Sequence, residues 1–584
     1  MDKYYTKEIH TQILIALLKA HGIRKIVASP GATNICFIAS IQNDPYFEIY
    51  SSVDERSAAY IACGLSAESG EPVVLSCTGA TASRNYIPAL TEAFYRKLPI
   101  LAITSTQRTD RIGHNIPQVI DRRMPLNDIV KMSVQVSEIN NEEDKWACEI
   151  AINKAILELK HHGGGPVHIN LVTNYSSIYN AKVLPSVNII NRITYKDVVP
   201  NILKGKIGIF VGNHKKWSPK LTELVDTFCE KYNAIVFCDH TSNYKGKYRA
   251  FAGLIATQEN YKSPCCFVDL LIHIGDISGG YMFFYPTKVW RVNPDGEVCD
   301  TFKKLQYTFE MEEEDFFERY INITTTERSK NTFIVEWKNE YERIYAKVPE
   351  LPFSNAWIAQ NTISRIPENS VLHLGILNTL RTWNYFEAPQ SVLGYSNTGG
   401  FGIDGCVSSL IGASLAEPNK LFFGVVGDLA FFYDMNSIGN RHVGNNIRLI
   451  VVNNGRGTEF RNYGHQGAKF GEATDMYIAA AGHYGKKSHV LLKHYAEDLG
   501  FEYISASNKE EYLNNVEKYL NPKITDKPIL FEVFTDSKDE SEAIRIMKNI
   551  EISTKGKAKK IVKSVIGEQG IDIIKNFIIM ERLI

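Results

Sequence analysis

Residues 421–460 read LFFGVVGDLAFFYDMNSIGNRHVGNNIRLIVVNNGRGTEF, and this stretch is the most informative about the fold. A first apolar run ends in Gly427 and Asp428, a helical stretch follows, and a second apolar run ends in Asn453 and Asn454. Two buried runs joined by a helix are typical of neighbouring strands in a parallel α/β sheet. Because the carboxyl ends of such strands meet at one edge, the pattern predicts a carboxylate and an amide side by side.

Carboxylate and amide oxygens with spare positions suit Mg²⁺, which keeps water and takes its other ligands from a phosphate-bearing cofactor. Asp428 and Asn454 are therefore the predicted metal ligands. The helix that follows Gly427, and begins with Asp428, Leu429 and Ala430, would offer free N–H groups to a diphosphate. A Gly-Asp pair alone is more often a simple turn, so the prediction rests on both pairs occurring within one strand-helix-strand interval.

The alternation of apolar strands and helices extends over most of the chain. After a helix that ends near Ala20, apolar runs predict strands at 25–28, 72–77, 98–104, 167–172, 205–212, 234–240, 270–276, 289–296, 371–375, 421–428, 447–454 and 529–534. We therefore expect an α/β protein with three doubly wound parallel-sheet domains and a short helical C-terminal extension. The expected limits are 1–185, 195–335, 350–540 and 541–584. The acidic segment 310–342 is expected to be a solvated helix or linker, and the extension to carry a basic patch at 555–563.

Composition narrows the class of protein. A chain of 584 residues with 44% apolar residues is too long for one core. Lys plus Arg and Asp plus Glu are equal at 65 each, so charge alone would not attract nucleic acid or an anionic membrane. The ten cysteines show neither zinc nor disulfide spacing, and no strand-linked G-x-G-x-x-G supports a dinucleotide site. Without a long uncharged apolar segment, the expected location is cytoplasmic.

Five motifs carry a resemblance to a known family: SPGATN (29–34), DERSAAY (54–60), SNTGGFGIDG (396–405), GDLAFFYDMN (427–436) and VVNNGRGTEF (451–460). Over about residues 4–540 the chain resembles the thiamine-diphosphate-dependent 2-oxo-acid decarboxylases and synthases. In most of these a GDG motif precedes NN, and Leu429 here replaces the last glycine. GDL and GIDG favour the branch of the menaquinone-pathway synthases, the 2-succinyl-5-enolpyruvyl-6-hydroxy-3-cyclohexene-1-carboxylate synthases.

The resemblance implies thiamine diphosphate and Mg²⁺ as cofactors and a domain order of pyrimidine-binding, central and diphosphate-binding. It implies a homodimer or a dimer of dimers, with each active site between two subunits. Small molecules would be the other partners, a 2-oxo acid donor and an acceptor, without nucleic acid or a membrane span. The metal would be held by Asp428, Asn454 and the backbone carbonyl of Arg456. The bent cofactor would rest on the glycine-rich turn at Phe401, Gly402 and Ile403.

Glu55 stands at a strand-to-helix transition in the DERSAAY motif. By itself it would be a carboxylate that interacts with the helix dipole. The resemblance implies more, because a carboxylic acid bonded to pyrimidine N1′ promotes the 4′-imino tautomer that removes the C2 proton. A largely apolar pocket would keep the needed proton on this acid.

The pocket residues predict a substrate different from that of the menaquinone synthases. That branch has Arg at the places of Thr33 and Thr398, and Thr cannot grip a carboxylate as bidentate Arg does. Asn34 shares the first of these loops. GHNIPQV resembles the loop that places a Gln near the thiazolium, here Gln118, with His114 and Asn115 beside it, although a lone loop His is usually a surface residue. The loop that carries two of the predicted metal ligands, residues 453–457, is called the metal loop. The stretch that follows it adds three candidates for substrate specificity: Phe460, Arg461 and His465. Arg461 would bind a substrate carboxylate in place of the arginines that this chain lacks.

The predicted function is decarboxylation of a 2-oxo acid and transfer of the acyl-anion equivalent to an acceptor, which makes the chain a carboligase. One alternative is a decarboxylase that releases an aldehyde, since the sequence does not choose between the two fates. A second alternative, of another class, is a catalytically silent scaffold that binds thiamine diphosphate, against which the presence of Glu55 argues. An α/β oxidoreductase is disfavoured because the glycine fingerprint is missing.

Overall fold

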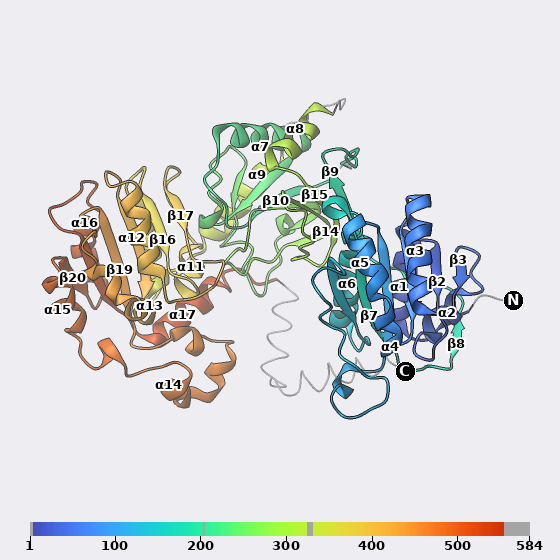
Figure 1. The fold of residues 1–584 in the computed structure, drawn as a ribbon. Helices are drawn as coiled ribbons and strands as arrows, with labels where there is room; N and C mark the ends of the chain where they lie inside the picture. Colours follow the sequence, from blue (N-terminus) through green and yellow to red (C-terminus); the bar gives the residue numbers. More distant parts are fainter. Residues whose placement is uncertain (1–3, 203–204, 324–330, 554–584) are drawn as a thin grey trace. The chain divides into compact units, whose positions relative to one another are not determined.

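The computed structural model describes residues 4–202, 205–323 and 331–553 (Figure 1). The chain is α/β, as predicted, with three parallel sheets of six, seven and six strands and a small two-stranded sheet. It forms two compact units, of which the first comprises Met1–Val199, Val289–Arg291 and Asp295–Glu310, and the second Pro200–Lys288, Val292–Pro294 and Met311–Ile584.

The first six-stranded sheet has the order β3-β2-β4-β5-β7-β6. Its strands are β2 (Lys25–Ala28), β3 (Glu48–Ser51), β4 (Val73–Cys77), β5 (Ile100–Thr106), β6 (Met132–Val136) and β7 (Val167–Val172). All neighbours pair in parallel, and Ala28 lies opposite Ser76. The loops that follow β2 and β4 therefore leave the same edge of the sheet side by side. A short antiparallel pair, β1 (Tyr5–Thr6) with β8 (Tyr179–Ala181), stands apart.

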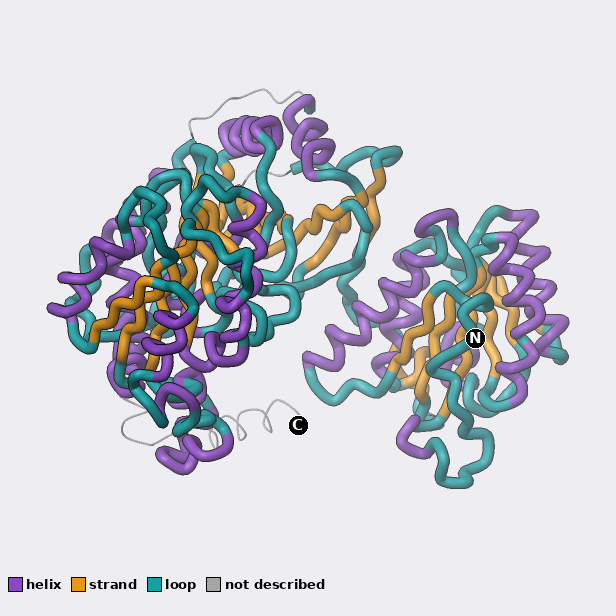
Figure 2. Tube along the Cα trace, turned by 60° about the vertical axis from the view of Figure 1, so that its left-hand side comes forward, coloured by secondary structure: helices purple, strands orange, loops and turns teal. Residues whose placement is uncertain are grey.

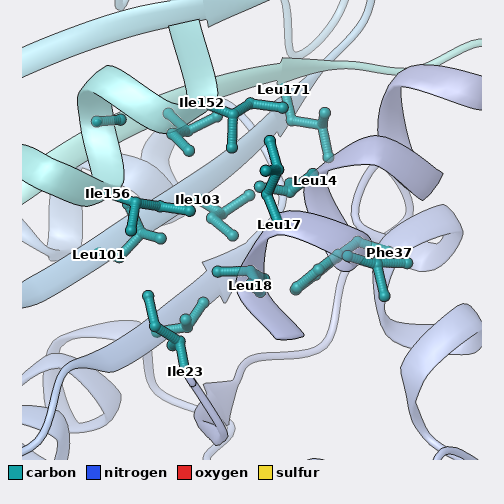
Figure 3. Close-up of a cluster of buried hydrophobic side chains, with 14 of the residues drawn as sticks. Leu14, Leu17, Leu18, Ile23, Phe37, Leu101, Ile103, Ile152, Ile156 and Leu171 are labelled. Atoms are coloured by element: carbon teal, nitrogen blue, oxygen red, sulfur yellow. The ribbon is translucent and has the colours of Figure 1, made fainter. Parts of the chain in front are cut away.

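Helices cover both faces of this sheet, which makes it doubly wound (Figure 2). One face carries α1 (Ile9–Ala20), α2 (Ile35–Ile41) and α6 (Glu142–Glu158), and the other α3 (Glu55–Ser69), α4 (Thr81–Asn85) and α5 (Ile87–Arg96). Figure 3 shows the first core, where Leu14, Leu17 and Leu18 of α1 meet strand side chains such as Ile103 and Leu171. Each fully buried side chain of this size contributes about 1.5–3 kcal/mol.

The second six-stranded sheet has the order β17-β16-β18-β19-β21-β20. Its strands are β16 (Val371–Leu374), β17 (Leu393–Tyr395), β18 (Phe422–Gly427), β19 (Ile447–Asn453), β20 (Glu502–Ala506) and β21 (Ile529–Phe534). Numbered along the chain, this is the same strand order as in the first sheet. The surrounding helices are α10 (Asn355–Thr362), α11 (Asn378–Trp383), α12 (Cys406–Ala416), α13 (Asp428–Tyr433), α14 (Thr474–Tyr477), α15 (Leu491–Asp498), α16 (Lys509–Tyr519) and α17 (Ser537–Met547).

The seven-stranded sheet has the order β12-β11-β10-β13-β14-β15-β9. Its strands are β9 (Asn191–Thr194), β10 (Ile207–Val211), β11 (Ala234–Cys238), β12 (Arg249–Phe251), β13 (Phe267–Ile274), β14 (Tyr285–Asn293) and β15 (Leu305–Glu310). Its helices are α7 (Pro219–Tyr232), α8 (Glu313–Asn322) and α9 (Phe333–Tyr345). Short 3-10 helices occur at Thr109–Arg111, His161–Gly163, His240–Ser242, Pro264–Cys266, Ile363–Arg365, Met435–Gly439, Thr458–Arg461, Gln466–Ala473 and Tyr484–Lys486.

The acidic segment that was expected to be solvated is more firmly packed than predicted. In α8 the acidic residues occupy the first turn, whereas Phe316, Phe317 and Tyr320 are fully buried. Phe317 and Tyr320 contact Phe228 of α7 edge to face. The high content of acidic residues favoured a solvated helix, but the helix is amphipathic and its apolar face packs into the core. The basic patch predicted at 555–563 lies outside the described residues, and among those described no helix is long and apolar enough to cross a membrane.

Both six-stranded sheets reverse the direction of their strand order between β2 and β4 in the first and between β16 and β18 in the second. In open α/β sheets the crevice outside the carboxyl ends of the strands at such a reversal is the usual ligand site. The loops that carry the predicted site residues leave the sheets at or beside these two places.

Candidate functional site

Asp428 lies at the reversal point of the second six-stranded sheet, where β18 ends and α13 begins. Its side chain is 5% exposed, and its Oδ2 accepts a hydrogen bond from the Gly455 backbone N–H at 2.9 Å. Burial raises the pKa of this carboxyl to about 7, although backbone N–H groups work against the rise. No cationic side chain compensates this acid in the described part of the chain, so it lacks the partner that a buried carboxylate needs.

The two asparagines at the end of β19, Asn453 within the strand and Asn454 directly after it, have different roles. Asn453 is committed to the fold, because its Nδ2 donates to Glu532 Oε1 at 2.6 Å and its Oδ1 accepts from Gly455 N at 3.2 Å. Asn454 Oδ1 is buried and has no hydrogen-bond partner. Gly455 turns the chain with φ +73°, a left-handed conformation that glycine adopts without strain. The Asn454 Oδ1 at this turn is therefore available to a ligand.

These groups fit Mg²⁺ with a diphosphate. The donors would be the Asp428 carboxylate, the unpartnered Asn454 Oδ1 and the Arg456 carbonyl, which also accepts from Thr458 N at 2.9 Å. All three are oxygens, and an all-oxygen set with open positions suits Mg²⁺. A Cβ placed on Gly427 would meet nothing within 4 Å, so the space above the strand end is open. Leu429, which replaces the last glycine of the GDG motif, is half-buried. Ala430 is buried within the six-residue helix α13.

The glycine-rich turn 396–405 follows β17 and is held in an unusual backbone conformation. Phe401 has φ +57°, a left-handed value that costs a non-glycine residue about 1 kcal/mol or more. A Cβ on Gly402 would lie 2.3 Å from Asp404 Oδ1, so a larger residue here would displace the exposed Asp404 side chain. Ile403 packs against the core beneath β18. Thr398 is buried, and its Oγ1 accepts from Asn213 Nδ2 at 2.8 Å, so it anchors the turn.

The residues after the metal loop divide into two groups. Arg461 is held inside the protein, because its Nη1 donates to the Gly471 carbonyl and lies 3.7 Å from Asp475 Oδ1. Asp475 also binds Arg456 Nη1 at 2.8 Å. Phe460 packs edge to face on His465, with ring centroids 5.3 Å apart. Of these side chains, His465 lines a cavity.

That cavity, of about 340 Å³, lies next to the metal loop in the second unit. Arg381 of α11 lines it, and sequence patterns did not single this residue out. Its Nη1 binds Glu459 Oε1 at 2.7 Å, its guanidinium lies 4.2 Å from the centroid of the Tyr281 ring, and its buried Nε has no hydrogen-bond partner. The one feature of the sequence that could have identified Arg381 is its place shortly after the apolar run of β16. The cavity thus has a cationic group in its wall.

In the first unit, Thr33 and Asn34 lie at the other reversal point and serve the fold. Thr33 Oγ1 is 2.6 Å from Thr78 Oγ1 and donates to the Ser105 carbonyl at 2.9 Å. Asn34 Nδ2 donates to the Ser29 carbonyl at 3.0 Å. Both side chains are buried. They therefore tie the loops after β2 and β4 together.

Glu55 is the first residue of α3, as predicted, and is half-buried. Asp54 caps the helix by accepting a hydrogen bond from Ser57 N at 3.0 Å, so the Glu55 carboxylate is not the N-terminal cap. Burial raises the pKa of the nearby Cys77 thiol to about 12, and the charge of Glu55 adds to the rise. The carboxylate of Glu55 therefore acts on the interior beside β4.

Gln118, His114 and Asn115 lie on an exposed loop after β5. Gln118 and Asn115 have φ +63° and +58°, so two left-handed residues shape this loop. The three side chains share one exposed segment.

A second buried acid, Glu540 of α17, makes stability depend on pH. It accepts from Asn355 N at 3.0 and 3.1 Å and from Thr535 Oγ1 at 2.7 Å. Burial raises its pKa from 4.5 to about 7. A carboxyl whose pKa is higher in the folded state supports folding at low pH, and this contribution is lost as the pH rises through about 7.

We therefore expect Glu540→Gln to gain stability relative to wild type between pH 5 and pH 8, by about 3 kcal/mol at most. Thermal unfolding followed at each pH would measure the difference. Glu510→Gln, at an exposed acid of α16 in the same unit, is the matched control and should show no such trend. A constant difference between Glu540→Gln and wild type across this range would contradict the assignment.

Comparisons with known proteins address the resemblance directly. Residues 10–124 match the thiamine pyrophosphate enzyme N-terminal TPP binding domain, and residues 378–533 match the C-terminal TPP binding domain of the same enzymes. The 2-succinyl-5-enolpyruvyl-6-hydroxy-3-cyclohexene-1-carboxylate synthase of Phocaeicola vulgatus is 32% identical over 560 residues, covering 91% of this chain and 96% of its own. The synthase of that name from Bacteroides fragilis is 30% identical over 550 residues, covering 91% and 97%.

A solved structure, the Rhodococcus jostii RHA1 thiamine diphosphate-dependent 4-hydroxybenzoylformate decarboxylase, aligns with a TM-score of 0.37 and 16% identity, covering 90% of this chain and 99% of its own. The resemblance drawn from the five sequence motifs, including the branch that they favour, is confirmed by the two synthases. Since a relative 32% identical spans 91% of the chain, and both cofactor-binding domains are matched, the chain belongs to the thiamine pyrophosphate enzyme family.

Proposed function

We propose that the chain catalyses the Mg²⁺- and thiamine-diphosphate-dependent decarboxylation of a 2-oxo acid and transfers the remaining acyl unit to an acceptor. The observation that carries the proposal is the pair of buried, uncompensated oxygens, on Asp428 and Asn454, at the reversal point of a doubly wound sheet. The names of the relatives support ligation rather than release, because each is called a synthase.

In this proposal Asp428, Asn454 and the Arg456 carbonyl hold Mg²⁺, and the metal with the N–H groups of 427–430 holds the diphosphate. When bound, thiamine diphosphate supplies the electron sink for loss of CO₂. The protein supplies position and charge: Phe401 and Ile403 support the cofactor from the glycine-rich turn. The left-handed Phe401 supports this role, since backbone strain of this kind persists at ligand-binding turns.

Glu55 would hold a proton against N1′ of the cofactor pyrimidine. We propose a homodimer in which the partner subunit's Glu55 completes each site, with 1–185 as the pyrimidine-binding domain, 195–335 as the central domain and 350–540 as the diphosphate-binding domain. Gln118 would face the reacting carbon, with His114 and Asn115 beside it. The left-handed backbone at Gln118 supports a functional loop.

For donor recognition we propose Arg381 in place of Arg461. Arg461 is tied to Gly471 and Asp475, whereas Arg381 lines a cavity with His465 and keeps an unused Nε donor. Thr33 and Thr398 are engaged in bonds that hold loops, so they contribute shape rather than a carboxylate grip. The donor would then be a 2-oxo acid with a second carboxylate that displaces Glu459 from Arg381.

We expect Arg381→Lys to raise KM for a dicarboxylic donor such as 2-oxoglutarate by about 10–100-fold, the value of a charge-assisted hydrogen bond, with a smaller change in kcat. Lys keeps a positive charge beside Glu459, so the fold should survive. Steady-state kinetics with 2-oxoglutarate and with pyruvate measure the effect. Arg441→Met, at an exposed position of the same unit, is the control, and an equal rise in KM for pyruvate would rule out recognition of the second carboxylate.

Product analysis tests the proposed reaction. A ¹³C-labelled 2-oxo acid, mixed with the holoenzyme and a panel of enone and aldehyde acceptors, should give a labelled product with the mass of acceptor plus donor minus CO₂. Labelled aldehyde alone, with every acceptor, would identify a non-ligating decarboxylase. Unchanged donor despite bound cofactor would identify a silent scaffold.

A further inference from the structure

A cluster of potential metal ligands lies in the first unit, far along the chain from Asp428. His161 and His162 follow α6, and Glu310 ends β15. One ligand atom from each lies within 4.8 Å of the others. His161 Nε2 is 3.6 Å from Glu310 Oε2, and His162 Nε2 is 3.3 Å from Glu310 Oε1. The three residues have no place in the proposed reaction.

The hydrogen bonding of His161 fixes which nitrogen carries its lone pair. Its Nδ1 lies 2.8 Å from Glu158 Oε2, and only a protonated Nδ1 can donate to that carboxylate. In the neutral ring Nε2 is then the lone-pair atom. This atom is buried without a hydrogen-bond partner and faces a Glu310 oxygen. Two lone pairs that face one another in a buried site repel, unless a cation lies between them.

The imidazoles of His161 and His162 are stacked with centroids 3.7 Å apart, and both rings approach the Glu310 carboxylate. The nearby Arg192 guanidinium does not lie between His161 Nε2 and Glu310 Oε2. Its Nε donates to the Gly296 carbonyl at 3.0 Å and lies 3.9 Å from Glu310 Oε2. A metal ion accepts two neutral imidazoles and a carboxylate without repulsion between their lone pairs.

The spacing fits a tetrahedral ion. Zn²⁺ bonds of about 2.0–2.1 Å to nitrogen and oxygen place tetrahedral ligand atoms about 3.3–3.4 Å apart. His161 Nε2 and His162 Nε2 approach different oxygens of Glu310, at 3.6 and 3.3 Å, and one ligand atom from each residue lies within 4.8 Å of the others, so a rotation of the carboxylate brings one oxygen to this spacing from both rings. Glu158, itself 3.2 Å from Lys131 Nζ, orients His161 as the carboxylate does in a carboxylate–histidine–zinc arrangement. The left-handed backbone of His162, with φ 44°, turns its ring toward the same point.

We infer that His161, His162 and Glu310 bind one first-row divalent transition metal, of which Zn²⁺ is the representative, with water as the fourth ligand. A cavity of about 590 Å³, which these three residues help to line, supplies the solvent position. Two imidazoles favour Zn²⁺ over Mg²⁺, so this site and the oxygen site at Asp428 select different metals. The ion would tie the turn after α6 to the end of β15.

The test uses the full chain without a polyhistidine tag, loaded with Mg²⁺ and thiamine diphosphate and stripped of transition metals. Titration with Zn²⁺ against a chromophoric chelator should give one Zn²⁺ per chain, and Co²⁺ should give the intense visible absorption of tetrahedral coordination. His162→Asn should weaken Zn²⁺ binding at least about 10–100-fold. Its side chain is 62% exposed and Asn tolerates left-handed backbone, so this variant should fold.

Two further variants separate the site from other zinc ligands. Glu158→Gln should weaken Zn²⁺ binding about 10–100-fold through the orientation of His161 alone. Cys299→Ser, which removes the exposed cysteine of the same unit, should leave the affinity unchanged. Absence of stoichiometric binding, an unchanged affinity in His162→Asn, or an affinity that falls in Cys299→Ser instead would overturn the inference.

Discussion

Asp428→Asn should lower the affinity for thiamine diphosphate in the presence of Mg²⁺ by more than about 100-fold and remove cofactor-dependent activity. Asp428 supplies the charged ligand of the proposed metal site, and an amide cannot neutralise Mg²⁺. Asn has the same shape and its Oδ1 can still accept from Gly455 N, so the fold should be retained. Isothermal titration with the cofactor at fixed Mg²⁺ measures the loss.

The controls for this variant separate loss of a ligand from loss of structure. Asp498→Asn, an exposed acid at the end of α15, should bind the cofactor as wild type does. Thermal unfolding of cofactor-free Asp428→Asn should match or exceed that of wild type, because an uncompensated buried carboxylate has been removed. Near-normal cofactor affinity in Asp428→Asn would mean that the metal is held elsewhere.

Glu55→Gln should reduce turnover by about 10²–10⁴-fold, the usual contribution of a positioned acid or base, while the cofactor still binds. Glu55 begins α3 without capping it, since Asp54 performs that task, so the substitution should leave the helix intact. The direct readout is the rate at which the C2 proton of bound thiamine diphosphate exchanges with deuterium, which needs no substrate.

Glu68→Gln, an exposed acid near the end of the same helix, is the matched control for this variant and should exchange as fast as wild type. An exchange rate in Glu55→Gln equal to that of wild type would show that another group activates the cofactor. A parallel loss of cofactor affinity would assign Glu55 to binding instead.

The interior strands could be predicted from the sequence, and the edge strands could not. Strands such as β4, β5, β7, β18 and β19 are mostly apolar and almost fully buried because both faces are covered by helices. The strands at the sheet edges, β3, β6, β17 and β20, are short or carry exposed polar residues, and their pattern resembles that of a loop. Edge strands lack a neighbour on one side, so the burial signal is weak.

The candidate site divides in the same way. Asp428 and Asn454 could be predicted because strand ends fix where they lie. Arg381 could not, since its value comes from a cavity built by side chains distant in sequence, such as Tyr281 and Glu459. The engagement of Arg461 could not be predicted for the same reason, because its partner Asp475 is visible only in the folded chain.

The most direct test of the central claim is release of CO₂ from a panel of 2-oxo acids that includes pyruvate, 2-oxoglutarate and phosphonopyruvate. The panel is run with the acceptor mixture present, with and without Mg²⁺ and thiamine diphosphate. We predict release from at least one acid, strictly dependent on both cofactors and absent in Asp428→Asn. Tight cofactor binding without CO₂ from any acid, or release that persists in Asp428→Asn, would contradict this account.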